Sequence, residues 1–226
     1  MATYAQMQDR INLDYLNRTD LGAETKRAII RAVKHYEKER FWFNMTATAL
    51  AVGTASMTVA VPADFIALDF VTVRDASLDS IVVLRSFDRI AYQRRTVAAG
   101  GAAASGVAQE ICYWQDQLQF FPKPNSATTM TVHYVHTLPV LSADADTNAW
   151  TSAGEDLIIH HATADMLANV LRVADVGQIQ SHKTWEMEAY KMLKFGNDMR
   201  LGMGEEKGMV GTIQGQAPKT PDSNMP

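Results

Sequence analysis

Apolar residues recur every three or four positions in the first forty residues of the chain. This spacing predicts two amphipathic helices, one over residues 3–18 and a second that starts near Gly22. The stretch YEKERFWF closes the second helix with three adjacent aromatic residues, Phe41, Trp42 and Phe43. Neighbouring side chains on a helix lie about 100° apart, so three in a row cannot share one buried face. We therefore predict that helix gives way to sheet here, and that the aromatic side chains wedge the two layers together.

The spacing changes from helical to alternating after Asn44. Alternating apolar and polar residues are typical of half-buried strands. They predict strands over residues 55–61, 66–74, 80–84 and 129–137, and a hairpin around Gln115 to Gln117. Between these strands the sequence predicts a short helix over residues 86–95 and a loop of small residues over 97–106.

Helical spacing returns near residue 152. Ser152 and Glu155 have the S-x-x-E spacing of a capping box, which predicts a helix start and a helix that runs to about Val173. A final helix is expected over roughly residues 176–200.

This order of elements predicts an α+β fold. Two N-terminal and two C-terminal helices would form an antiparallel helical core, with a mostly antiparallel β domain inserted between them. The predicted regions are a helix pair (1–44), the inserted β-rich domain with one short helix (45–151), a second helix pair (152–200) and an extended C-terminal tail (201–226).

The last 26 residues, 201–226, are rich in glycine and proline. Such a segment buries too little apolar surface to offset its ordering entropy alone, so we expect it to dock on a partner. Its sizeable apolar side chains are the expected anchors: Met203, Met209, Val210 and Ile213.

Composition narrows the class of protein. The 226 residues carry a formal net charge of −4, which disfavours a nucleic-acid-binding protein because such proteins neutralise phosphates. A single cysteine, Cys112, excludes an internal disulfide and cysteine-cluster metal sites. The most apolar region, residues 49–73, contains acidic residues, glycine and proline and does not predict a membrane span. The N-terminus lacks an apolar signal segment, so we expect synthesis in a cytoplasm without a membrane anchor.

Candidate chemistry is sparse. His160 and His161 are adjacent, so on a helix they point about 100° apart and are poorly placed to chelate one ion. Asp144–Glu155 partly matches a calcium loop, although Ala149 stands where the loop requires glycine. The common nucleophile, zinc and phosphate-loop motifs are absent, so we expect neither an enzyme nor a cofactor. Two alternatives stay open: a calcium-dependent hydrolase around that loop, and a ligand-binding module in a β-domain cleft near Tyr113, Trp114 and Phe120.

Three segments together resemble head-to-tail adaptor (connector) proteins of tailed bacteriophages, of the short-tailed-phage type. The first, DRINLDYLNRTDLGAETKRAIIRAVKHYEKERFWFN (9–44), looks like the family's opening helix pair and its aromatic end. The second, VPADFIALDFVTV (61–73), resembles a proline–aspartate turn that leads into a strand. The third, LQFFPKPNSATTMTVHYVHTLPVL (118–141), resembles two strands that lead towards the closing helices.

The resemblance implies a non-enzymatic virion protein at the head-to-tail junction. It implies a ring of twelve copies beneath the portal, which joins the capsid to tail or nozzle proteins, with DNA only as passing cargo. The family's C-terminal segment docks on the portal or a neighbouring subunit, which would suit the tail. Phe41, Trp42 and Phe43 and the four tail anchors are then the expected partner-interface residues. A ring also needs two different surfaces per subunit, and we expect the charged helix Lys34–Arg40 and an acidic face with Glu186 and Glu188 to supply them.

Overall fold

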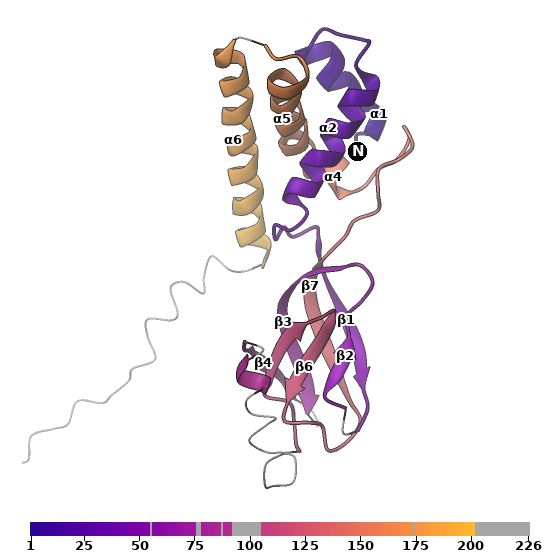
Figure 1. Cartoon of the computed structure of the whole chain (residues 1–226), viewed down its shortest axis with the longest axis vertical. Helices are drawn as coiled ribbons and strands as arrows, with labels where there is room; N and C mark the ends of the chain where they lie inside the picture. The colour runs from indigo at the N-terminus through magenta and orange to yellow at the C-terminus, as the bar shows by residue number, and fades with distance from the viewer. Residues whose placement is uncertain (55, 76–77, 87, 92–104, 174, 202–226) are drawn as a thin grey trace, which may run out of the picture.

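The computed structural model describes residues 1–54, 56–75, 78–86, 88–91, 105–173 and 175–201. Helices from both ends of the chain gather at one end of an elongated molecule, and the strands gather at the other (Figure 1). The predicted α+β class is confirmed. None of the helices within these ranges is long and apolar enough to cross a membrane.

The N-terminal segment is helical from its first turn. Thr3 forms a capping box: its hydroxyl accepts from the Gln6 N–H at 3.2 Å, and the Gln6 side-chain oxygen accepts from the Thr3 N–H at 2.8 Å. Helix α1 (Tyr4–Asp9) continues directly into the π-helical segment η1 (Arg10–Tyr15), which agrees with the helix predicted over residues 3–18. Helix α2 (Gly22–Tyr36) starts at the predicted residue.

The C-terminal helices begin earlier than the sequence suggested. Asn148 caps a short helix, α4 (Ala149–Ser152), by accepting from the N–H groups of Trp150 and Thr151. The predicted capping box at Ser152 and Glu155 is wrong, because the Ser152 hydroxyl donates to the carbonyl of Asn148 instead. The chain then forms α5 (Glu155–Asp165), the π-helical segment η2 (Met166–Val170) and α6 (Val176–Leu201).

The strands form a seven-stranded sheet within the described residues, in the order β1-β7-β3-β4-β5-β6-β2. Their bounds are β1 Met45–Val52, β2 Thr58–Ala60, β3 Phe65–Asp75, β4 Leu78–Leu84, β5 Glu110–Trp114, β6 Gln117–Phe121 and β7 Thr128–His136. Only β4 and β5 pair in parallel in this part of the chain; the other pairs are antiparallel. The long strand β7 lies between β1 and β3, with Val132 opposite Thr48 on one side and Val71 on the other.

Most of the predicted β elements are present, with two differences. The strand expected over residues 55–61 is reduced to β2, and β1 was not predicted. The hairpin turns at Gln115 and Asp116, as expected, and both residues have positive φ. Residues 88–91 of the expected short helix are helical; residue 87, residues 92–95 and most of the loop 97–106 lie outside the described residues.

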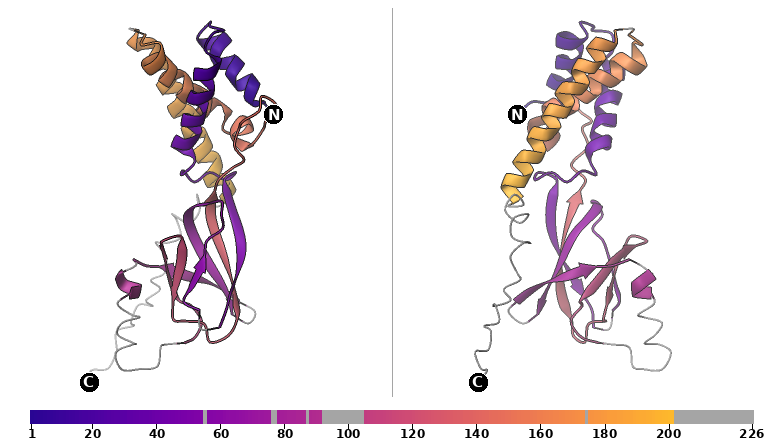
Figure 2. Two further views of the ribbon diagram at one scale, coloured as in Figure 1. Left: turned by 45° about the vertical axis from the view of Figure 1, so that its right-hand side comes forward. Right: turned by 90° about the vertical axis from the view of Figure 1, so that its left-hand side faces the viewer.

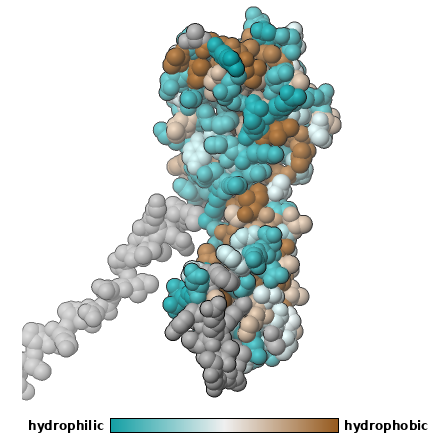
Figure 3. All heavy atoms as spheres, viewed as in Figure 1, coloured by the Kyte–Doolittle hydropathy of each residue, from teal (hydrophilic) through white to brown (hydrophobic). Residues whose placement is uncertain are grey.

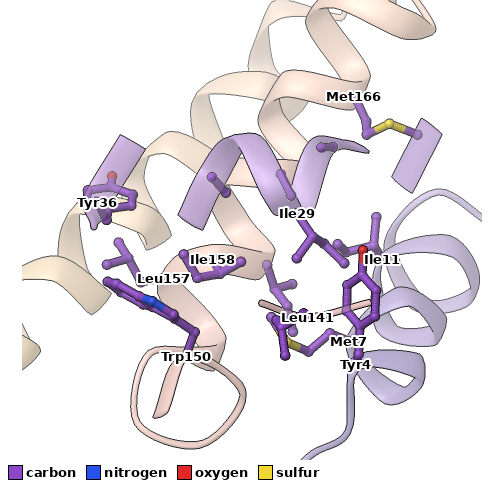
Figure 4. Packing of buried hydrophobic residues seen from close by; sticks show 14 of the residues in the cluster. Tyr4, Met7, Ile11, Ile29, Tyr36, Leu141, Trp150, Leu157, Ile158 and Met166 are labelled. Atoms are coloured by element: carbon purple, nitrogen blue, oxygen red, sulfur yellow. The ribbon is translucent and has the colours of Figure 1, made fainter. Parts of the chain in front are cut away.

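Two hydrophobic clusters stabilise the molecule. One joins the helices and includes Tyr4, Ile29, Trp150 and Ile158 (Figure 4). The other lies inside the sheet and includes Val71, Phe120 and Val132. The segment between α2 and β1 and the segment between β7 and α4 connect the two clusters (Figure 1).

Candidate partner interface

Residues 37–44 join the end of α2 to the start of β1, so the aromatic stretch lies where helix gives way to sheet, as predicted. Asn44 shapes this junction from a buried position. Its side-chain oxygen accepts from the Phe41 N–H at 2.8 Å, and its amide donates to the Glu39 carbonyl at 2.8 Å. These bonds satisfy backbone groups that the end of the helix leaves without partners.

The three aromatic side chains have different environments. Phe41 is fully buried in the helical cluster and stacks on Phe43, with ring centroids 5.3 Å apart. Both rings meet the edge of Trp150. Trp42 meets Phe43 edge-to-face with ring centroids 5.5 Å apart, and the Arg200 guanidinium sits 3.8 Å from the Trp42 ring centroid. Phe41 therefore acts within the subunit, while Trp42 is half-buried and ties the end of α6 to the junction.

Charged side chains add a second set of contacts at the junction. Arg40 pairs with Asp69 of β3 at 2.7 Å. Lys194 of α6 donates to the Glu39 carboxylate at 2.8 Å and to the Arg40 carbonyl at 3.1 Å. The hydrogen bond from Lys194 lowers the pKa of Glu39. Burial raises the pKa of Asp69, and the attraction of Arg40 offsets this only in part. The junction therefore binds α6 and β3 to the same short segment.

A group of polar and aromatic side chains lies farther along the helices, between α2, α5 and α6. His161 contacts the Glu186 carboxylate at 2.7 Å and stacks on His35, and the Tyr36 hydroxyl also donates to Glu186. Burial would raise the pKa of Glu186, but the two hydrogen bonds, together with the attraction of His161 and His35, outweigh burial and lower it. Glu186 therefore makes its hydrogen bonds within the subunit.

The neighbouring residue, His160, turns to a different set of partners, as the helical spacing predicted. Its Nδ1 lies 3.3 Å from the Nδ1 of His182, and both rings contact Tyr15 and Trp185. Burial lowers the pKa of His160 and lowers that of His182 to about 4. No group of three or more metal-ligating side chains occurs among the described residues.

The junction geometry coincides with the aromatic stretch that carried the strongest family resemblance. A comparison with protein families matches residues 2–199 to the SU10 adaptor protein family. The chain belongs to this family of phage head-to-tail adaptors. It is a structural component of the virion, and the family associates with portal and tail proteins. A comparison with curated proteins finds no match to the chain.

The adaptor's candidate calcium loop directs its carboxylates to different partners. Asp146 accepts from the N–H groups of Ser142 and Ala143, both at 2.7 Å. Asp144 pairs with Lys26 at 2.8 Å, and Glu155 pairs with Arg10. These carboxylates are therefore committed to holding the segment that leads into α4 against the N-terminal helices.

The other predicted sites of the adaptor are only partly brought together. Tyr113 and Trp114 line an open hollow with Leu84 and Arg85, whereas Phe120 is fully buried in the sheet cluster. The predicted tail anchors Met203, Met209, Val210 and Ile213 lie outside the described residues.

Proposed function

We propose that the adaptor forms a ring of twelve copies beneath the portal, joins the capsid to the tail and leaves a passage for DNA. The observation that carries this proposal is the family match, which spans nearly all of the described residues. A net charge of −4 is compatible with a conduit, because a channel without strong positive charge does not trap a passing polyanion.

In this proposal each of the four predicted regions has its own role. The two terminal helix pairs (1–44 and 152–200) form an antiparallel helical core that builds the ring, and the inserted domain (45–151) projects from it. Residues 201–226 dock on the portal, with Met203, Met209, Val210 and Ile213 as anchors. Trp42 is half-buried against Arg200, near the end of α6, and Phe43 is half-buried beside Trp42.

Mass photometry of the full chain, alone and mixed with the portal ring of the same phage, tests the proposal. We expect the adaptor to form a multi-subunit complex with the portal. Deletion of residues 202–226 leaves α6 whole, so the truncated subunit should fold normally but bind the portal more weakly. Full portal binding by the truncated chain would contradict the docking role. If the full-length chain stays monomeric and does not bind the portal, the result would instead favour a ligand-binding module at the hollow near Tyr113 and Trp114.

A further inference from the structure

Helix α6 carries an uncovered apolar stripe on its outer side. Trp185, Met192, Phe195 and Met199 are spaced by seven, three and four residues, and they are 43%, 73%, 66% and 71% exposed. This spacing places them on one side of the helix. The side that packs against the rest of the helical cluster carries His182, Glu186, Tyr190 and Leu193. Contiguous apolar patches of several hundred Å² on a soluble protein mark interaction sites.

A second apolar surface lies beside α2. Ile30 and Val33 of α2 and Leu138 and Val140 of the segment after β7 line a groove, and Val140 is 75% exposed. Hydrophobic surface is visible in this region of the space-filling view (Figure 3). Helix α2 meets α6 through Tyr36, which donates to Glu186, whereas the groove lies on another side of α2, next to the segment after β7. The α6 stripe and the α2 groove are therefore well separated on one subunit.

Charged residues border the two surfaces in a complementary order. Glu188 and Lys191 accompany the α6 stripe, and Lys34 and Glu37 border the α2 groove. Within the described ranges none of these four side chains has an ion-pair partner in its own subunit. Pairing Glu188 with Lys34, and Lys191 with Glu37, would join opposite charges in both positions.

The positions of these charges along their own helices also agree. Lys34 and Glu188 each lie twelve residues after the first residue of their helix, Gly22 and Val176. Both helices start at the end remote from the sheet and run towards it (Figure 2). Subunits related by rotation about a ring axis parallel to the long axis of the molecule keep this direction. An α6 and a neighbouring α2 are then parallel, so the matching charges come into register when the two helix starts lie level.

We infer that the α6 stripe of one copy docks in the α2 groove of a second copy of this chain. The contact joins two different surfaces, so its repetition closes a ring when each step is a pure rotation that divides a full turn. The inference rests on the proposed ring function and names the two faces that meet in it. The inferred contact is apolar and is bordered by Glu188 of the expected acidic face and by Lys191, while Glu186 bonds within its own subunit.

Cysteine cross-linking tests which faces meet. Val140→Cys, Met192→Cys and the double variant are mixed with the portal ring and treated with a short bismaleimide. Wild type is the control, since its one cysteine, Cys112, is buried. We expect the double variant to form a ladder of covalent multimers. A mixture of the two single variants should form a covalent dimer and nothing larger. Either single variant alone should form no more cross-linked product than wild type.

Two results of the cross-linking experiment would overturn the inference while leaving the proposed function standing. One is a complex of the expected multi-subunit mass in which the double variant forms no ladder. The other is a covalent dimer from Met192→Cys alone, which would show that α6 meets α6 across a two-fold axis. If wild type forms no complex with the portal at all, the proposed function itself fails.

A charge exchange provides an independent test. The pair Glu188→Lys with Lys191→Glu keeps the net charge, and so does the pair Lys34→Glu with Glu37→Lys. Each pair alone should raise the adaptor concentration needed for half-maximal assembly by about tenfold, because like charges then face each other. All four changes together should restore assembly to within about threefold of wild type. Val176→Asp, at an exposed α6 position away from the stripe, is the matched control and should assemble normally.

The predicted charge partners would be wrong if the fourfold variant assembled as poorly as each two-residue variant. They would also be wrong if both two-residue variants assembled as well as wild type. Circular dichroism of each variant separates a lost contact from a lost fold.

Discussion

Lowering the pH should destabilise the adaptor through His182. This side chain is 3% exposed, between Tyr15, His160 and Trp185. Burial, and then repulsion from His160, lowers its pKa to about 4. In the unfolded chain the pKa returns to about 6.5, so the unfolded state takes up the proton first as the pH falls. Stability is therefore complete above about pH 6.5 and declines between pH 6.5 and pH 4.

The size of this effect follows from the two pKa values. A difference between about 4 and about 6.5 corresponds to about 3 kcal/mol when the titration is complete, and to about 2 kcal/mol at pH 5. His160 contributes in the same direction because its pKa is also lowered. Carboxyl groups with lowered pKa, such as Glu186 and Asp165, lose their stabilising effect only at lower pH, below about 4.5. The interval from pH 7.5 to pH 5 therefore reports mainly on the buried histidines.

Urea unfolding at pH 7.5 and pH 5 measures the effect, with His182→Gln as the matched variant. Glutamine does not titrate, so the variant should lose about 2 kcal/mol less than wild type over this interval. The reasoning would be refuted if wild type lost less than about 0.5 kcal/mol, or if the variant lost as much as wild type.

Two further predictions concern the junction. Phe41→Ala removes a fully buried ring that packs against Phe43 and Trp150. In chemical denaturation it should reduce the free energy of unfolding by about 3–5 kcal/mol. A reduction below about 1 kcal/mol would contradict the place of Phe41 in the core. Arg40→Met leaves the Asp69 carboxylate without its ion-pair partner and should cost about 1–3 kcal/mol, because the pair is only partly exposed to water. Adding Asp69→Leu should recover most of that loss, and failure to recover it would show that the pair itself stabilises the fold.

The helices and central strands were predictable because their side chains repeat with the period of the element. Helix α2 has a strong apolar contrast between its two faces, and strand β7 and the second half of β3 alternate buried residues with less buried ones. Strand β1 was missed because its sequence, MTATALAV, alternates threonine with alanine and offers little contrast. The cap at Asn148 was missed because Ser152 and Glu155 match the same kind of motif four and seven residues later, and local spacing does not decide between them.

The candidate interface was predictable only where it is local. The position of Phe41, Trp42 and Phe43 between helix and sheet follows from three adjacent aromatic residues after a charged helix. Their partners Trp150 and Arg200 lie more than one hundred residues away in the sequence, and only packing of the helices brings them close. The same holds for His161 with Glu186 and for His160 with His182, where no motif signals the contact.

We expect the Arg40–Asp69 pair to contribute more to geometry than to stability. Removing two charges from water costs free energy that their attraction barely offsets, so well-packed apolar side chains would be about as stable. An ion pair, however, is directional, and this one joins the junction to β3 while Lys194 and Arg200 join the junction to α6. If α2 and α6 supply the ring contacts, these bonds set the angle at which the sheet leaves the ring. We therefore expect the double variant Arg40→Met with Asp69→Leu to fold and to assemble on the portal normally, yet to join the tail less efficiently. Normal attachment of tails to portal–adaptor complexes built from this variant would show that the pair does not set that angle.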